Sequence, residues 1–364
     1  MKRHPLLIAV AVVALLAGCT APGPGPSGLA PGDATGVQPA GNPEVVASDL
    51  TTPWSLVRLS DGTTLISERD TGLVRQLLAS GEYGESWSID GVVPGGEGGL
   101  LGLAVDPEER YLYLYFTAAD DNRVVRAELS NDDAGWSIGE PDVILDGLPK
   151  SGNHNGGRIA IGPDGMLYVT AGDAGDPNRA QTLDSLGGKI LRVEPDGAIP
   201  TDNPFEDSPV WSMGHRNPQG IAWDDEGTMY AAEFGQNTWD EFNRIEPGGN
   251  YGWPVVEGKG GGDDFVDPLY QWSPSEASPS GLLYTQGTFF LAALRGERVW
   301  VLYVDGDTVS AVSWFEGEHG RIRHAAEGPD GTLWLLTSNT DRNGDNREGA
   351  DQVLQYRLNE LVEG

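Results

Sequence analysis

Short β-rich segments joined by glycine-containing turns recur along this chain, and the repeat limits what the chain can fold into. In each unit an apolar stretch is followed by a tight turn, such as Gly162-Pro163-Asp164-Gly165, and then by a second β-forming stretch. The turns lie about 45–60 residues apart, which is the spacing of β-propeller blades. The six units cover residues 54–67, 101–117, 159–170, 220–233, 282–292 and 323–337.

The repeat predicts an all-β fold, a six-bladed β-propeller. No segment shows a helical period of useful length, and a single blade buries its faces only when blades pack around a common axis. We expect the last strand, within residues 352–358, to pair with the first, within residues 44–47, and so to close the ring. A β-sandwich or two smaller β-domains are the alternatives, but repeats this numerous do not fit a sandwich.

The N-terminal segment is typical of an exported bacterial lipoprotein. Two basic residues precede an apolar run over residues 6–17, which is too short to span a bilayer and ends in Leu16-Ala17-Gly18-Cys19. The pattern predicts a signal peptide over residues 1–18 and lipidation of Cys19, which would anchor an extracytoplasmic protein to the bacterial cell membrane. An ordinary signal peptide with a chance cysteine is the alternative.

The rest of the chain divides into a tether and a domain. Residues 19–42 are rich in Pro, Gly and Ala and predict a flexible tether. Residues 43–360 predict the propeller domain, which has a normal size for a single all-β domain. Cys19 is the only cysteine, so the domain has no disulfide and its core alone stabilises it.

The chain is strongly acidic, with a formal charge of −32 from 23 basic and 55 acidic residues. Such a surface repels nucleic acid and anionic lipid headgroups, so neither is an expected partner. Where several arginines converge in so acidic a protein, a local anionic ligand is the simplest explanation.

Polar, glycine-rich clusters near strand ends mark the candidate site. His154 lies in Asn153-His154-Asn155-Gly156-Gly157-Arg158, and a second cluster over residues 214–220 contains His215 and Arg216. We interpret His215 as a structural residue that supports Arg216. The chain has no zinc motif, no Gly-x-Ser-x-Gly elbow and no convincing dinucleotide fingerprint, so zinc, serine-hydrolase and nicotinamide chemistry lack support.

Three arginines and a glycine-rich stretch, residues 95–102, complete the candidate site. Arg321 and Arg323 alternate along a predicted strand and therefore share one face, where two cations are costly without an anion. Arg295 is the third arginine. Residues 341–345 resemble a calcium loop but lack its closing glutamate, and we interpret them as a turn. Because propeller loops converge on the central channel, we expect these clusters to meet at one mouth.

Six motifs follow one another along the chain: GGEGGLLGLAVDP, HNGGRIAIGPDGMLYVTAGDAG, LGGKILRVEPDG, GHRNPQGIAWD, GGNYGWP and GRIRHAAEGPDGTLWLLT. With them the chain resembles the soluble pyrroloquinoline-quinone (PQQ)-dependent sugar dehydrogenases, the glucose/sorbosone dehydrogenase or aldose sugar dehydrogenase-like proteins. The resemblance covers nearly everything from Val45 to Leu358 and implies a six-bladed propeller, in agreement with the repeat. It also implies PQQ and Ca²⁺ as cofactors.

The resemblance assigns roles to several residues. It makes His154 the general base that takes the proton of the sugar's anomeric hydroxyl while hydride passes to the quinone C5 carbonyl, a task that suits a neutral imidazole. Arg216 and Asn217 match residues that hold the quinone oxygens. The basic positions that pair with the cofactor's three carboxylates are matched by Arg295, Arg321 and Arg323.

The resemblance also implies ligands for calcium. Gly235 and Gln236 match two positions whose backbone carbonyls bind the calcium ion that polarises the cofactor. Glu241 and the carbonyl of Tyr251 match ligands of a further, structural calcium. Gln181 matches a glutamine on the substrate or cofactor side.

Three residues depart from the family pattern. Glu97 stands where the family often has a glutamine in the pocket, which predicts a like-charge clash with an anionic cofactor there. Arg295 replaces a frequent lysine and keeps the charge but not the shape. Gln236 replaces a frequent proline, which is harmless if only its carbonyl is used.

The expected function is PQQ-dependent oxidation of the anomeric hydroxyl of aldose sugars to lactones, with electrons passed to an external acceptor. A calcium-dependent lactonase is one alternative, since six-bladed propellers host that activity too, but its carboxylate cluster cannot be assembled from this sequence. A non-catalytic propeller that binds glycans or envelope partners is the other, and Glu97 is its only support.

Overall fold

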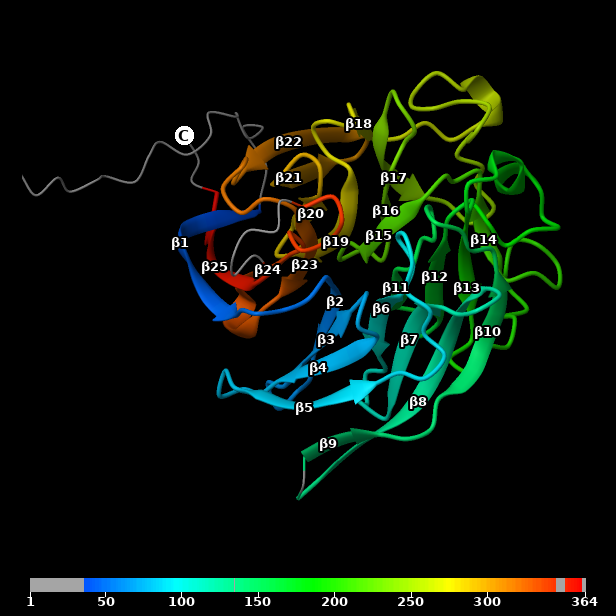
Figure 1. Cartoon of the computed structure of the whole chain (residues 1–364). Helices are drawn as coiled ribbons and strands as arrows, with labels where there is room; N and C mark the ends of the chain where they lie inside the picture. The colour runs from blue at the N-terminus through cyan, green and yellow to red at the C-terminus, as the bar shows by residue number, and fades with distance from the viewer. Residues whose placement is uncertain (1–35, 134, 345–350, 362–364) are drawn as a thin grey trace, which may run out of the picture.

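The computed structural model describes residues 36–133, 135–344 and 351–361, and these form an all-β ring of six sheets. Figure 1 shows the sheets as blades arranged around a central axis. The predicted six-bladed β-propeller is confirmed. Each predicted repeat unit corresponds to the first two strands of one blade, because that pair is joined by the turn that the sequence makes conspicuous.

The first three blades come from the N-terminal half of the chain. Blade 1 contains β2 (Pro53–Arg58), β3 (Thr64–Glu68), β4 (Leu73–Leu77) and β5 (Tyr83–Ser88). Blade 2 contains β6 (Leu100–Val105), β7 (Tyr111–Thr117), β8 (Asn122–Asp132) and β10 (Asp142–Leu148), with β9 (Gly135–Ile138) paired to the end of β8. Blade 3 contains β11 (Ile159–Ile161), β12 (Leu167–Ala171), β13 (Lys189–Val193) and β14 (Val210–Met213).

The other three blades complete the ring. Blade 4 contains β15 (Pro218–Trp223), β16 (Met229–Glu233), β17 (Asp240–Ile245) and β18 (Tyr270–Trp272). Blade 5 contains β19 (Pro279–Thr285), β20 (Thr288–Ala293), β21 (Arg298–Asp305) and β22 (Thr308–Trp314). Blade 6 contains β23 (Ile322–Glu327), β24 (Leu333–Thr337), β25 (Val353–Glu360) and, as its outermost strand, β1 (Val37–Ala47).

Packing between blades explains the composition of the second strands. Every residue of β3, β12, β16, β20 and β24 is buried. Neighbouring blades cover both faces of these strands. The strands therefore consist largely of apolar residues, without a strict alternation of apolar and polar positions. The core is thus distributed between the blades, and the first strand of each blade is left to line the axis.

The ring is closed by β1 and β25, as predicted. Glu44 pairs with Gln355 and Val45 with Leu354, and Figure 1 shows the blue and red strands side by side. The predicted boundary between tether and domain is wrong, however. β1 begins at Val37, whose side chain is buried and whose N–H donates to Thr288 Oγ1 at 2.8 Å, so residues 37–42 belong to the domain.

The signal peptide, Cys19 and the first part of the tether lie outside the described residues. Their assignments stay predictions. The described helices are three short 3₁₀ turns, η1 (Pro177–Gln181), η2 (Gly262–Asp264) and η3 (Pro329–Gly331). No helix in the described ranges is long and apolar enough to cross a membrane.

Removing β1 should open the ring. A chain that begins at Ser48 exposes the edge of β25 and the apolar side chains that pack on Val37, so we expect its Tm to fall by roughly 10 °C relative to a chain that begins at Gly36. Differential scanning calorimetry of the two proteins measures this. Equal Tm values would show that the closure contributes nothing to stability.

Candidate functional site

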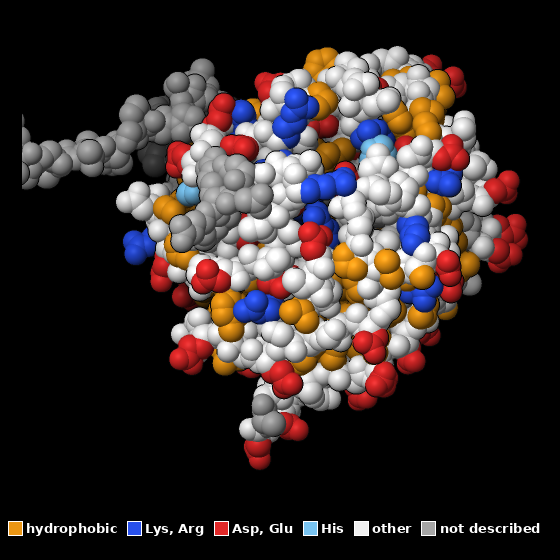
Figure 2. Space-filling view, in the orientation of Figure 1, with side chains coloured by type: hydrophobic (Ala, Val, Ile, Leu, Met, Phe, Trp, Pro, Cys, Tyr) orange, Lys and Arg blue, Asp and Glu red, His pale blue; other side chains and the backbone are white. Residues whose placement is uncertain are grey.

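One end of the ring holds a polar cavity of about 440 Å³ to which all six blades contribute. We call it the upper cavity. Figure 2 looks onto this end and shows basic side chains gathered near its centre, close to a histidine. The lining residues are Trp54, Arg69, Glu97, His154, Arg216, Asn217, Gln219, Phe234, Ser278, Leu294, Arg295, Arg321, Arg323, Asp341 and Asn343.

The topology explains why residues so distant in sequence meet here. Most of them lie in two kinds of loop, the one that enters the inner strand of a blade and the one that joins the second strand to the third. Because successive strands are antiparallel, both kinds of loop emerge at the same end of the blade.

His154 is presented by a tight loop that requires glycine. Its own φ is +55°, a left-handed conformation that is uncommon for residues other than glycine. A Cβ on Gly172 would lie 2.1 Å from the His154 carbonyl oxygen, and one on Gly156 would lie 2.4 Å from the Thr170 carbonyl. Only glycine permits these approaches, and they bring His154 beside the residue that follows Gly172.

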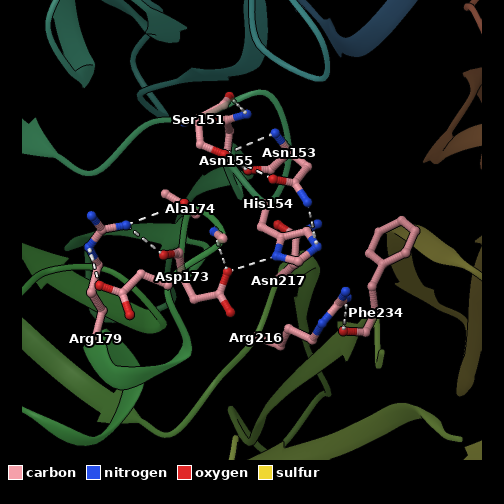
Figure 3. A network of polar contacts seen from close by, with 12 residues as sticks. Ser151, Asn153, His154, Asn155, Asp173, Ala174, Arg179, Arg216, Asn217 and Phe234 are labelled. Carbon is pink, nitrogen blue, oxygen red and sulfur yellow. Dashed lines mark hydrogen bonds and ion pairs between the residues drawn. The ribbon is translucent and has the colours of Figure 1, made fainter. Parts of the chain in front are cut away.

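That residue, Asp173, orients the imidazole. His154 Nδ1 lies 2.7 Å from Asp173 Oδ1, and Trp253 Nε1 donates to Asp173 Oδ2 at 2.9 Å. Burial alone would raise the pKa of Asp173, but the hydrogen bonds from His154, Gly175 and Trp253 outweigh it, and the pKa lies below its ordinary value. The carboxylate is therefore ionised at neutral pH and accepts the Nδ1 proton (Figure 3).

In the neutral imidazole the other ring nitrogen, Nε2, then carries the lone pair. It lies 3.3 Å from the side-chain amide nitrogen of Asn153, which is a donor. On the backbone side, His154 N donates to Glu97 Oε2 at 2.8 Å. Glu97 thus lines the cavity, as expected, and it also fixes the loop that carries His154.

Arg216 and Asn217 are held by a buried carboxylate. Glu233 Oε1 accepts the backbone N–H groups of both residues, and its Oε2 lies 2.7 Å from His215 Nδ1. His215 is fully buried, and its Nε2 lies 2.8 Å from Ser212 Oγ. These contacts agree with a structural role for His215, which is shut off from the cavity that Arg216 lines.

The Arg216 guanidinium faces both the cavity and a backbone turn. Nη1 donates to the carbonyls of Phe234 at 3.3 Å and Gly235 at 2.5 Å, while the buried Nε has no partner. Figure 3 shows this side chain pointing toward Phe234 beside His154. Burial lowers the pKa of Arg216 in spite of the surrounding carboxylates.

Arg321 and Arg323 do share one face, and a carboxylate that the sequence analysis missed joins them. Asp341 Oδ2 lies 3.2 Å from a guanidinium nitrogen of each. The pair therefore has an anion within the protein, and the expectation that it needs one from a ligand is too simple. Asp341 does begin a turn, since its Oδ1 accepts from Asn343 N at 2.8 Å, but its main contacts are these two cations.

Positive charge still exceeds negative charge around the upper cavity. Five arginines line it, the fifth being the unpredicted Arg69, against the two carboxylates Glu97 and Asp341. Arg295 is exposed at its rim. Burial lowers the pKa of Arg323 to about 10 although Asp341 opposes this effect, and its Nε has no partner. Such a site favours an anionic ligand.

The residues assigned to calcium lie beside this cavity. Gly235, Glu241 and Tyr251 line a separate space of about 10 Å³ together with Glu233 and Glu257, which is room for about one water-sized particle. Burial, with the nearby charge of Glu233, raises the pKa of Glu241 to about 8. Within the described ranges no three acidic, histidine or cysteine side chains form a metal-binding group.

The structure thus brings most predicted site residues together but not all. Glu97, His154, Arg216, Asn217, Arg295, Arg321 and Arg323 line the upper cavity. Gln181 does not line it, because its amide pairs with Asn250 and with the Trp253 carbonyl. Gln236 is exposed, and its N–H donates to Glu257. The sequence analysis missed Trp54, Arg69, Asp173, Gln219 and Asp341 as site residues, although Asp173 and Gln219 stand within quoted motifs.

Comparison with known proteins identifies relatives over most of the chain. The family model described as glucose/sorbosone dehydrogenase matches residues 50–345. The PQQ-bound aldose sugar dehydrogenase of Streptomyces coelicolor is 47% identical, with a TM-score of 0.85 over 89% of this chain and 98% of that one. Aldose sugar dehydrogenase YliI of Escherichia coli is 32% identical over 81% of this chain and 90% of its own length. Quinoprotein glucose dehydrogenase B of Acinetobacter calcoaceticus is 34% identical over 59% and 52%.

Asp341 should stabilise the fold in a pH-dependent way. Burial would raise its pKa, but Arg323 and Arg321 outweigh that effect and hold the pKa below its ordinary value. The ionised carboxylate therefore contributes stability above about pH 4, and this is lost as the pH falls through the lowered folded-state pKa. We expect Asp341→Asn to lower the free energy of unfolding by about 3 kcal/mol at pH 7 and by less at pH 3.

Urea unfolding at the two pH values measures this difference. Asp307→Asn is the control, because the exposed Asp307 pairs with the partly exposed Arg244 and should matter little at either pH. A loss for Asp341→Asn that is the same at pH 7 and pH 3 would contradict the assignment.

Proposed function

The chain belongs to the glucose/sorbosone dehydrogenase family, and from this premise we propose that it oxidises the anomeric hydroxyl of aldose sugars to lactones with PQQ as cofactor. The observation that carries the proposal is the meeting of an oriented imidazole and five guanidiniums in one cavity. Electrons would then pass to an external acceptor.

The upper cavity fits a compact, multiply charged anion. Its volume of about 440 Å³ lies in the range of sites for small organic ligands. Nε of Arg216 and Nε of Arg323 are buried without a partner, and unsatisfied cationic donors of this kind are costly unless an acceptor approaches. Planar carboxylates match guanidinium geometry well.

Four arginines would hold the carboxylates of PQQ. Arg321 and Arg323 share the carboxylate of Asp341, Arg295 is exposed at the rim, and Arg69, which follows β3, lines the same cavity. Arg216 and Asn217 would face the quinone oxygens. When bound, PQQ supplies a two-electron acceptor for the hydride that leaves the sugar C1.

His154 would act as the general base. Asp173 holds the proton on Nδ1, so Nε2 carries the lone pair that can accept the anomeric proton. The imidazolium formed in this way would be stabilised by the carboxylate 2.7 Å away. Glu97 and the glycines of the loop keep the ring at the cavity wall.

We extend the proposal to Ca²⁺, held through the carbonyls of Gly235 and Gln236 and, at a second position, through Glu241 and Tyr251. The small space beside Glu241 and the raised pKa of this carboxyl support a cation there. The Gly235 carbonyl accepts from Arg216 in this structure, so a calcium ion there would share this oxygen with a guanidinium of the same charge, which favours movement of Arg216 on binding. Lipid anchoring through Cys19 and an extracytoplasmic location likewise stay predictions.

The lactonase alternative gains no support from the geometry. It requires several carboxylates that meet at the channel floor, whereas the floor of the upper cavity is formed by Gln219, Arg323 and Trp54. The non-catalytic alternative rested on Glu97, whose carboxylate is engaged by the His154 backbone.

Replacing His154 should abolish turnover but not cofactor binding. With PQQ, Ca²⁺ and a panel of aldoses, we expect dye reduction by the wild-type protein and a fall in kcat of about 10³-fold for His154→Asn, the size of a general-base contribution. PQQ binding, followed by its absorbance, should be unchanged. His319→Gln, whose side chain does not line the cavity and is hydrogen-bonded to Tyr356, should keep full activity.

Two outcomes would contradict this proposal in different ways. No dye reduction by the wild-type protein with any aldose would overturn the proposed function. Dye reduction that persists in His154→Asn would support the proposed function but show that His154 is not the general base.

Replacing Asp173 tests its role as a positioning residue. In Asp173→Asn the amide can donate to Nδ1 and so place the proton on Nε2, the wrong nitrogen for a base. We expect kcat to fall about 10²-fold while KM for the sugar and PQQ affinity stay the same. Trp253→Phe, which removes the indole donor to Asp173 but keeps an aromatic ring beside Arg216, should cost much less. A change in KM or PQQ affinity with kcat unaltered would show that Asp173 shapes the cavity instead.

A further inference from the structure

A second cavity, of about 410 Å³, lies along the same axis and shares no lining residue with the upper cavity. We call it the distal cavity. All six inner strands contribute to it, mostly with aliphatic side chains that include Val57, Leu103, Ile161, Ile221 and Leu282. Each inner strand begins at the upper cavity, as Trp54 and Arg321 show, and later residues such as Val57 line the distal one. The two cavities therefore lie toward opposite ends of the channel.

A thin polar layer separates them. Arg158 Nε donates to the Gln219 carbonyl at 2.9 Å, and Nη1 donates to Ser55 Oγ at 3.1 Å. The Gln219 side chain in turn accepts from Ser280 and from Arg323. Gln219 and Arg323 face the upper cavity, whereas Arg158 and Ser55 face the distal one.

Arg158 is the unusual member of this layer. It is 4% exposed, its partners are a carbonyl, a hydroxyl and the face of Trp54 at 4.2 Å, and its Nη2 has no hydrogen-bond partner. Burial, and then the charge of Arg323, lower the pKa of Arg158 to about 9. Among the described residues it forms no ion pair with a carboxylate, although acids outnumber bases more than twofold in this chain.

We propose that the distal cavity binds a small amphipathic carboxylate, with its headgroup on Arg158 and its aliphatic chain against the inner strands. A buried guanidinium without a counter-ion favours an anion, and the aliphatic wall favours an apolar chain over a sugar or a free phosphate. His324, the other ionisable group that lines the cavity, is kept neutral because burial and the charge of Arg158 lower its pKa. His324 therefore adds no second cation, and Arg158 alone is charged among the residues that line the cavity.

Isothermal titration calorimetry with octanoate tests the proposal. We expect one molecule to bind per chain in the distal cavity, and octanol, which has the same chain but no charge, to bind at least about tenfold more weakly, as a lost charge-assisted hydrogen bond requires. Equal affinity for the two compounds, or no binding of octanoate, would overturn the proposal.

Two variants and a control locate the site. Arg158→Gln removes the cation, and Ile161→Asn makes the wall polar at the partly exposed end of β11, away from the buried layer. Each should weaken octanoate binding about tenfold or more. Arg321→Gln removes a cation from the upper cavity and should leave this binding unchanged.

The pattern of the three variants decides the outcome. If Arg158→Gln does not fold, octanoate binding by Ile161→Asn alone tests the proposal. Octanoate binding that is lost in Arg321→Gln and kept in Ile161→Asn would place the carboxylate in the upper cavity and contradict the proposal.

Discussion

The pairing of β1 with β25 is the interaction on which the rest of the structure depends. Every blade contributes to the upper cavity, so the site exists only while the ring is closed. The closure joins the first described strand to the last one, about 300 residues away, and it is therefore a non-local contact with a large entropic cost. The burial between blades and the hydrogen bonds of β1 together offset that cost.

Closure gathers positive charge in an acidic protein. Arginines from blades 1, 4, 5 and 6 meet in one cavity, and a single buried carboxylate, Asp341, joins two of them. Mutual repulsion of guanidiniums in a confined space is destabilising unless anions compensate it. Asp341 supplies part of the compensation from within the chain. A bound anionic cofactor would supply further compensating negative charge, so the protein would be more stable with the cofactor than without it.

The sequence is sufficient for the fold but only partly for the site. The six turns could be predicted, because turn chemistry and β-forming runs are local. The non-local closure could be predicted because a ring of blades with no open edge requires the last strand to pair with the first. His154 and Arg216 could be found from their glycine-rich motifs. Asp341 could not be recognised as the partner of Arg321 and Arg323, because this pairing spans two strands and their connecting loop. Arg69 stands in no motif and reaches the cavity only through the position of its blade.

Long-range contacts also explain why the predictions for Gln181 and for the domain boundary were wrong. Gln181 is held by Asn250, a residue of the next blade's loop, and no sequence spacing reveals such a pairing. The domain boundary was misplaced because residues 37–42 contain Gly, Pro and Ala, which resemble a linker in composition. Val37 is nevertheless buried between blades 5 and 6. The composition of a segment indicates how the segment behaves in isolation. Here the contact of Val37 with Thr288 makes the segment part of the domain.

Strand direction accounts for the different chemistry at the two ends of the channel. The inner strands are entered through polar segments such as Arg321-Ile322-Arg323 and continue into aliphatic positions such as Ile221 and Leu282. Because all six inner strands begin at the same end, their polar entries form one charged mouth and their later residues form an apolar one. Arg158 lies where the two meet. A guanidinium at that boundary contacts the polar layer through Nε and Nη1, while its buried Nη2 has no hydrogen-bond partner. The proposed anionic ligand of the apolar mouth would offset this cost of burial.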